Sequence, residues 1–232
     1  MSKGLLALSS ALAIVAARAY AIGPDELSRM VQWYGQSSLR IEMGGKLVWL
    51  DPVKVPIVEK ADLILITHDH ADHYSPADIK KLSGPTTIVL VGFDGSSFPR
   101  IRPGDRRTFG DLSIEAVPAY NVVKTQFHPK SAGYCGFILS AGALRLYDAG
   151  DTERIPEMKN IDCDVAFLPL GQTYTMGSVA EAAQAALDVK AKIAIPIHFG
   201  LYEGTEADAK EFARLLRGKV DAIELKRSQS RQ

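Results

Sequence analysis

The first half of the chain consists of short hydrophobic runs separated by polar turns. Residues 38–42 and 47–50 flank Gly44-Gly45, and this arrangement predicts a β-hairpin. Residues 63–66 form a continuous apolar run between polar neighbours, which predicts a buried strand. A further strand is expected at 86–91.

Three segments carry the signals that begin a helix. Ser75-Pro76 places a capping residue before a proline at the first helical position, which predicts a helix to about residue 82. Ser178 and Glu181 form a capping pair for a helix over 179–187. Thr205 and Asp208 do the same for a last helix that ends near residue 216.

The second half alternates strands with these helices. The expected strands are 112–117, 136–140, 144–147, 165–170, 193–197 and, as a closing strand, 222–225. Gly142 marks a hairpin turn between the second and third of them. Hairpins early in the chain and strand-helix units later predict one α/β domain of stacked layers.

The N-terminus differs from the rest of the chain. Residues 1–21 have a short basic start, an apolar stretch and small residues at Ala19 and Ala21, which predicts an export signal cleaved after Ala21. An organelle-targeting peptide and an uncleaved helix packed on the domain are the alternatives. The hydrolase-like domain would then cover 22–232, and the protein would be periplasmic or secreted, with no stable membrane span after processing.

Composition excludes several classes of protein. The 27 basic and 27 acidic residues cancel, and 47% of residues are hydrophobic, as in an ordinary globular protein rather than a disordered or nucleic-acid-binding one. Cleavage after Ala21 would leave a net charge of −2, because Lys3 and Arg18 are lost with no acid. Cys135 and Cys163 lie in apolar stretches and are expected to be buried free thiols.

The segment directly after the buried strand 63–66 concentrates potential metal ligands. His68, His70, Asp72 and His73 fall within six residues, although the chain has only five His. Imidazole and carboxylate groups bind Zn, Mn or Fe. Four ligands from one loop exceed what one tetrahedral ion with a bound water needs, so the spacing favours two divalent ions, with Zn the first choice.

This segment resembles the H-x-H-x-D-H motif of the metallo-β-lactamase superfamily, and the likeness spans residues 31–226. The resemblance implies an αββα sandwich with metals at one edge between two sheets. It also implies that Asp151, after strand 144–147, bridges the ions, and that His198, after strand 193–197, binds the second one. The third His expected for the first ion is missing near Asn121, so His128 replaces it, Asn121 binds weakly, or this ligand is absent.

Further motifs look similar to small single-domain hydrolases such as L-ascorbate-6-phosphate lactonase. They are Ala119-Tyr120-Asn121, the stretch 127–130 and the stretch 171–176. The resemblance suggests substrate contacts from Tyr120, Asn121, Thr173 and Tyr174, and from His128 if it is not a ligand. His128 is expected within reach of the metal cavity in either case.

Two ions about 3.5 to 4 Å apart can share a hydroxide that attacks a substrate at neutral pH. Asp72 would orient this nucleophile as well as bind metal, and is the expected catalytic residue. Asp51 could orient a ligand His, and formation of the turn Asp51-Pro52 is the equal alternative. No nucleophile elbow, Walker A or dinucleotide-binding motif is present in the sequence.

The sequence therefore predicts a metal-dependent hydrolase that cleaves an ester, lactone or phosphodiester bond in a small-molecule substrate. One alternative is a phosphodiesterase similar to N-acylphosphatidylethanolamine phospholipase D. The other is a metal-bound binding or sensor protein without activity. The oligomeric state and the native metal are left open.

Overall fold

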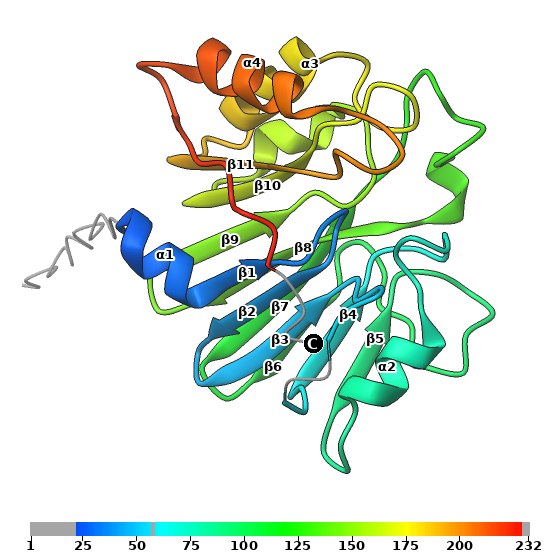
Figure 1. The fold of residues 1–232 in the computed structure, drawn as a ribbon. Helices are drawn as coiled ribbons and strands as arrows, with labels where there is room; N and C mark the ends of the chain where they lie inside the picture. The colour runs from blue at the N-terminus through cyan, green and yellow to red at the C-terminus, as the bar shows by residue number, and fades with distance from the viewer. Residues whose placement is uncertain (1–21, 57–58, 229–232) are drawn as a thin grey trace, which may run out of the picture.

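The hydrophobic runs of the first third of the chain form a five-stranded sheet. In this computed structural model, which describes residues 22–56 and 59–228, its strands are β1 (Val31–Trp33), β2 (Leu39–Met43), β3 (Lys46–Leu50), β4 (Leu63–Ile66) and β5 (Ile88–Val91), in that order (Figure 1). Pairing is antiparallel from β1 to β3 and parallel from β3 to β5. Gly44 and Gly45 both have positive φ, as the tight turn between β2 and β3 requires, which confirms the predicted hairpin.

The remaining strands form a seven-stranded sheet. They are β6 (Arg106–Phe109), β7 (Leu112–Pro118), β8 (Cys135–Ala141), β9 (Leu144–Asp148), β10 (Val165–Pro169), β11 (Ile193–Ile197) and β12 (Asp221–Ala222), and they lie in reverse sequence order. Pairing is antiparallel from β6 to β9 and parallel from β9 to β12.

The described residues form four α-helices: α1 (Pro24–Met30), α2 (Pro76–Leu82), α3 (Val179–Asp188) and α4 (Glu206–Leu216). Two single 3₁₀ turns cover Lys130–Ala132 and Pro156–Asn160. The side chains of Ser75, Ser178 and Thr205 accept hydrogen bonds from the backbone N–H three residues later, so all three predicted N-caps are confirmed.

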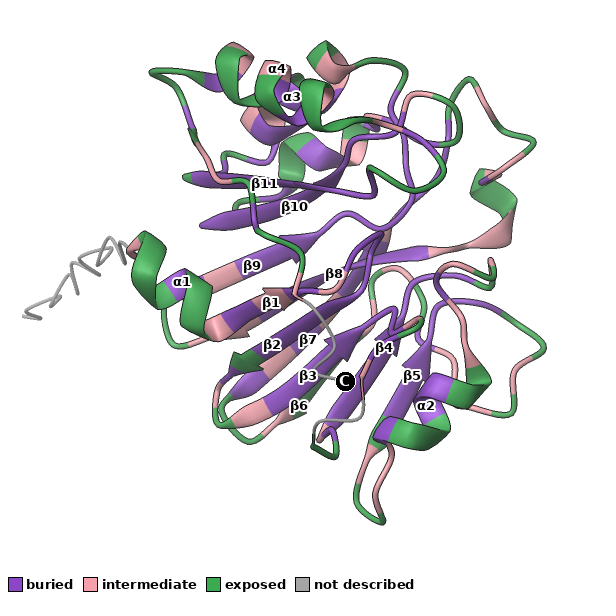
Figure 2. Cartoon of the chain, in the orientation of Figure 1, coloured by how far each residue is buried: buried purple, intermediate pink, exposed green. Residues whose placement is uncertain are grey.

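The two sheets pack face to face, with helices on their outer faces (Figure 1). Alternation along β4 shows how the layers form, since Leu63 and Leu65 enter the core between the sheets, whereas Ile64 and Ile66 face the cluster beneath α2. Helices α3 and α4 cover the seven-stranded sheet, and most residues of its central strands are buried (Figure 2). The predicted four-layer αββα sandwich is confirmed.

Two differences from the sequence expectation lie at the edges of the fold. The closing strand is the two-residue β12, one residue earlier than predicted, because only Asp221 and Ala222 pair with β11. Strands β1 and β6 and helix α1 were not predicted. Cys135 and Cys163 are buried and free, as expected.

The predicted export signal at residues 1–21 lies outside the described residues. Within the described part of the chain, no helix combines the length and apolarity needed to cross a membrane.

Gly92 gives a testable packing constraint between the sheets. A Cβ atom there would overlap the carbonyl oxygen of Thr67 and lie 3.2 Å from Cys135 Cβ. We expect Gly92→Ala to lower the free energy of unfolding by about 1–3 kcal/mol and the Tm by about 5 °C, because overpacking forces the backbone to move. Gly23→Ala, where nothing lies within 4 Å of the added Cβ, is the control for thermal unfolding. Equal Tm values for both variants would contradict the constraint.

Candidate metal centre

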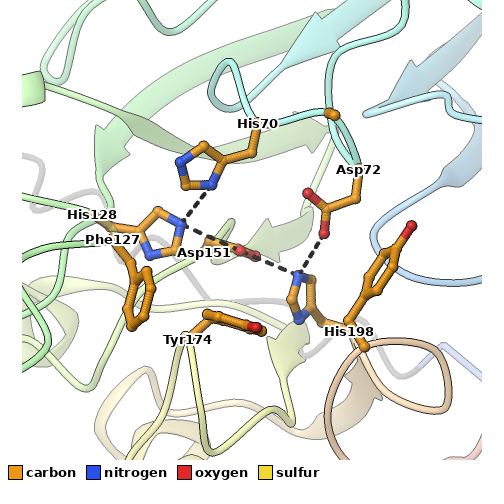
Figure 3. A pocket seen from close by; sticks show the side chains of 9 residues that line it. His70, Asp72, Phe127, His128, Asp151, Tyr174 and His198 are labelled. Atoms are coloured by element: carbon orange, nitrogen blue, oxygen red, sulfur yellow. Dashed lines mark hydrogen bonds and ion pairs between the residues drawn. The ribbon is translucent and has the colours of Figure 1, made fainter.

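The candidate ligands lie on loops that leave the carboxyl ends of strands in both sheets. His68, His70, Asp72 and His73 follow β4, Asp151 follows β9, and His198 follows β11. The loop between β7 and β8 adds His128. Because parallel strands end at the same edge of a sheet, these loops meet there, and the side chains of His70, Asp72, His128, Asp151 and His198 point toward one another (Figure 3).

One set of nitrogens comes from His68, His70 and His128, whose ligand atoms lie within 4.8 Å of one another. His128 Nε2 lies 3.2 Å from His70 Nδ1 and 3.4 Å from Asp151 Oδ2. The structure thus places His128 where the sequence lacked a third His for the first ion. Its role as a ligand stays a prediction.

Asn121, the other candidate for that position, has a different role in the structure. Its side-chain amide donates to the carbonyl oxygens of Lys124 and Tyr174, 3.1 and 2.7 Å away, and its backbone N–H donates to the carbonyl of His128. These bonds close the loop that carries His128. The amide nitrogen of Asn121 therefore supports the site, while its buried Oδ1 has no hydrogen-bond partner among the described residues, so weak metal binding by Asn121 stays a prediction.

A second set comes from Asp72, His73 and His198, again within 4.8 Å of one another. His198 Nε2 lies 3.1 Å from Asp151 Oδ2, and His73 Nε2 lies 3.4 Å from Asp151 Oδ1. Since Asp151 Oδ2 also faces His128 and lies 3.8 Å from His68 Nε2, its carboxylate stands between the two sets. This is the position required of a carboxylate that bridges two ions.

The donor set fits divalent metal ions. His68 Nε2 is buried and has no hydrogen-bond partner among the described residues, although buried polar atoms are almost always satisfied. A metal ion at this position would bind the free lone pair. Imidazole nitrogens with carboxylate oxygens suit Zn, Mn or Fe.

The charges of the site prepare it for cations. Burial would raise the pKa of Asp151, but the positive charges of His198 and His73 outweigh burial and hold this pKa well below its usual range. Burial likewise opposes ionisation of Asp72, yet His198 and His73 lower its pKa to about 2. Both carboxylates are therefore anionic at neutral pH.

The histidines of the two sets differ in protonation. Burial lowers the pKa of His68 well below its usual value and that of His128 to about 4, so both are neutral at pH 7. Burial also disfavours charge on His73, but Asp151 and Asp51 raise its pKa to about 10. The second set must therefore release protons when it binds metal.

Asp51 and Thr67 orient two of the candidate ligands from behind. Asp51 Oδ2 lies 2.7 Å from His73 Nδ1 and accepts a 2.6 Å bond from the Thr67 hydroxyl, and Oδ1 accepts from the Thr67 backbone N–H. Thr67 Oγ1 lies 2.9 Å from His68 Nδ1. These contacts leave Nε2 of both rings facing the centre. The positive φ of Asp51, 43°, shows that this residue also forms the turn after β3.

Sequence reasoning missed Gln36 and Glu203. Gln36 Nε2 donates to Asp72 Oδ2 at 3.0 Å and lies 2.8 Å from His198 Nε2. Buried Glu203 places Oε1 2.9 Å from His198 Nδ1, while its Oε2 accepts from the backbone N–H groups of Thr173 and Tyr174. Neither residue belongs to a local sequence motif, so the sequence alone gave no reason to place either of them at the metal centre.

Two variants test the role of Glu203. A Cβ on Gly171 would overlap its carboxyl group, so Gly171→Ala must push Glu203 away, and Glu203→Gln removes its charge directly. We expect each variant to lower kcat/KM and metal affinity by about 10- to 100-fold, because His198 loses the partner that orients it. Gly177→Ala is the matched glycine control, since its Cβ would meet the side chain of Glu181 instead. Unchanged metal affinity in both test variants would refute this role.

A cavity of about 290 Å³ opens beside the ligands (Figure 3). Its lining residues are His70, Ala71, Asp72, Phe127, His128, Asp151, Tyr174, His198 and Tyr202.

Of the four suggested substrate contacts, Tyr174 lines this cavity, whereas Tyr120, Asn121 and Thr173 do not. The Tyr120 hydroxyl donates to Glu157 Oε2 instead, 2.8 Å away, and its side chain belongs to the hydrophobic core.

Comparison with known proteins identifies the family of these residues. Residues 30–198 match the family model described as a β-lactamase superfamily domain. A UPF0173 metal-dependent hydrolase from Archaeoglobus fulgidus is 32% identical, in a match that covers 86% of this chain and 97% of the relative.

Two solved structures extend the likeness to the fold. A proposed metal-dependent hydrolase from Parabacteroides distasonis is 34% identical, with a TM-score of 0.75 over 86% of this chain and 93% of that one. The metallo hydrolase Igni18 from Ignicoccus hospitalis has a TM-score of 0.69 at 21% identity, over 86% and 95% of the two chains, and shows the shared fold.

Proposed function

The chain belongs to the β-lactamase superfamily and is a metal-dependent hydrolase. From this premise we propose that it binds two metal ions at the centre described above and uses them to cleave an ester, lactone or phosphodiester bond of a small molecule. The observation that carries the proposal is the position of the Asp151 carboxylate between two separate sets of ligand atoms. One ion would be held by His68, His70 and His128, and the other by Asp72, His73 and His198.

Divalent ions held by these residues would acidify water and polarise the carbonyl or phosphoryl oxygen of the substrate. The protein's own residues supply orientation. Asp72 faces the cavity, is ionised, and is held by Gln36, so it can accept a hydrogen bond from the attacking water and orient it (Figure 3). Glu203 and Asp51 fix the rings of His198 and His73, so that the second set keeps its geometry during turnover.

Removal of metal tests the proposal on the full chain. The protein is treated with a chelator and then titrated with Zn²⁺, Mn²⁺ or Fe²⁺, and metal per chain and hydrolysis are measured together. The substrates are γ-butyrolactone, 4-nitrophenyl acetate and bis(4-nitrophenyl) phosphate. We expect hydrolysis to vanish in the chelated protein and to return as the second equivalent binds. Tight binding of two equivalents with no turnover of any substrate would favour a binding or sensor protein instead.

A further inference from the structure

Two exposed aromatic side chains line the cavity. Among the described residues, six large hydrophobic side chains are exposed, and two of them, Tyr174 and Tyr202, line the cavity itself. Val122, Val123 and Leu201 lie on loops that also carry lining residues, and Ile88 lies on β5. Scattered exposed hydrophobics are ordinary, but aromatic side chains that line a cavity mark a surface that binds apolar groups.

Part of the cavity wall is aromatic. Phe127 and Tyr174 meet edge to face, with ring centroids 4.9 Å apart (Figure 3), and Tyr202 also lines the cavity. Hydrogen bonds hold Tyr174 in place, since its backbone N–H donates to Glu203 and its carbonyl accepts from Asn121. The backbone that presents Tyr174 is therefore fixed by contacts within the protein.

Cations are missing from this wall. No Lys or Arg lines the cavity in the part of the chain that the structure describes. Lys124, on the same loop as Phe127, donates to the carbonyl oxygens of Gln172 and Met176 and lies 3.7 Å from Glu153. Lys130 is engaged by Glu157. A phosphate carried by the substrate away from the reacting bond would lie against aromatic rings with no counter-charge.

We propose that the substrate is an uncharged carboxylic ester or lactone with an apolar side chain, and that this side chain binds between Phe127, Tyr174 and Tyr202. This inference rests on the proposed function, because the reacting carbonyl must face the ligand side of the cavity. In the reaction, water adds to the carbonyl carbon, the acyl C–O bond breaks, and the alcohol oxygen takes a proton, so a lactone gives one hydroxy acid.

The test compares γ-lactones that differ only in their side chain. The series runs from γ-butyrolactone to γ-hexalactone and γ-octalactone, with a γ-lactone that carries a phosphate monoester on an alkyl side chain as the charged member. We expect kcat/KM to rise by about two- to fourfold per added methylene until the cavity is filled. The phosphorylated lactone should be at least tenfold poorer than γ-octalactone. Equal or better turnover of the phosphorylated lactone would overturn the inference.

A charged substitution sharpens this test. Tyr202→Arg should weaken the dependence on alkyl length and improve the phosphorylated lactone by about tenfold, because it adds the missing cation. The matched control is Ile88→Arg, which makes the same kind of change at an exposed side chain that does not line the cavity. The same shift in selectivity in both variants would overturn the assignment of the wall.

A binding measurement separates this inference from the proposed function. The hydroxy-acid products share one carboxylate and differ only in side chain. Their relative affinities, measured by calorimetry, therefore show which side chain the aromatic wall binds better, without any turnover. Tighter binding of the alkyl product than of the phosphorylated one supports the inference even if no lactone is hydrolysed. In that case only the proposed hydrolysis fails. The reverse order of affinities overturns the inference even if hydrolysis is found.

Discussion

Asp151→Asn will reduce kcat/KM by at least about 100-fold and will lower metal occupancy, because one neutral amide replaces the anion that stands between both ligand sets. The carboxylate lies 3.1 Å from His198 and 3.4 Å from both His128 and His73, so its loss affects every ion held there. In the metal-free protein, the substitution should also lower the free energy of unfolding by about 3–5 kcal/mol, since charged His73 and His198 lose a buried partner. Steady-state kinetics, metal analysis and denaturant unfolding measure these three effects.

Asp69→Asn is the matched control for this prediction. Asp69 lies inside the same histidine motif, but its exposed carboxylate accepts a hydrogen bond from the Tyr134 hydroxyl, 2.7 Å away. We expect its metal content to equal that of the unmodified protein. If Asp151→Asn also keeps full metal content and activity, Asp151 is not the bridging carboxylate and the two-ion arrangement is wrong.

The elements that the sequence predicted well are those with a local physical cause. Strand β4 agrees at both ends because four consecutive apolar residues must be buried on both faces. Helix α2 agrees because Ser75 and Pro76 define its first turn. In each case the interactions that decide the structure lie within a few residues of one another.

The elements that were missed depend on distant partners. Strand β6 contains Arg106 and Arg107, both exposed, and is a strand only because it pairs with β7 at the sheet edge. Strand β1 has three residues and exists through its pairing with β2. A hydrophobic pattern carries no trace of such pairing when the strand is short or faces solvent.

The candidate site divides in the same way. The spacing of His68, His70, Asp72 and His73 is local, so the sequence alone indicated a metal centre there. Gln36 and Glu203 reach the site from opposite ends of the chain and lacked any motif. The sequence named His128 as a candidate. Its position beside His70, however, depends on the fold of the loop between β7 and β8, which Asn121 holds by hydrogen bonds that the sequence does not predict.

Asp51 will matter for activity as well as for stability. Asp51→Ala leaves the Thr67 hydroxyl, the Thr67 backbone N–H and His73 Nδ1 without the fully buried carboxylate that contacts all three. Because these buried groups lose their partner, the free energy of unfolding should fall by about 3–5 kcal/mol and the Tm by about 10 °C. Loss of the His73 orientation should reduce kcat/KM by about 10- to 100-fold at temperatures where the variant is folded.

Two further variants separate orientation of His73 from formation of the turn. Asp51→Asn keeps the side-chain volume and tolerates the positive φ at this position, so a role in the turn alone predicts normal activity. Orientation of His73 predicts a large loss, because an amide N–H facing Nδ1 favours the tautomer whose proton sits on Nε2, toward the centre. Asp78→Asn, a buried carboxylate that accepts from Lys54 N–H and Ser75 at the start of α2, should lower the Tm and leave kcat/KM and metal affinity unchanged. Asp51 acts on the centre through His73 only if Asp51→Asn loses activity and Asp78→Asn does not.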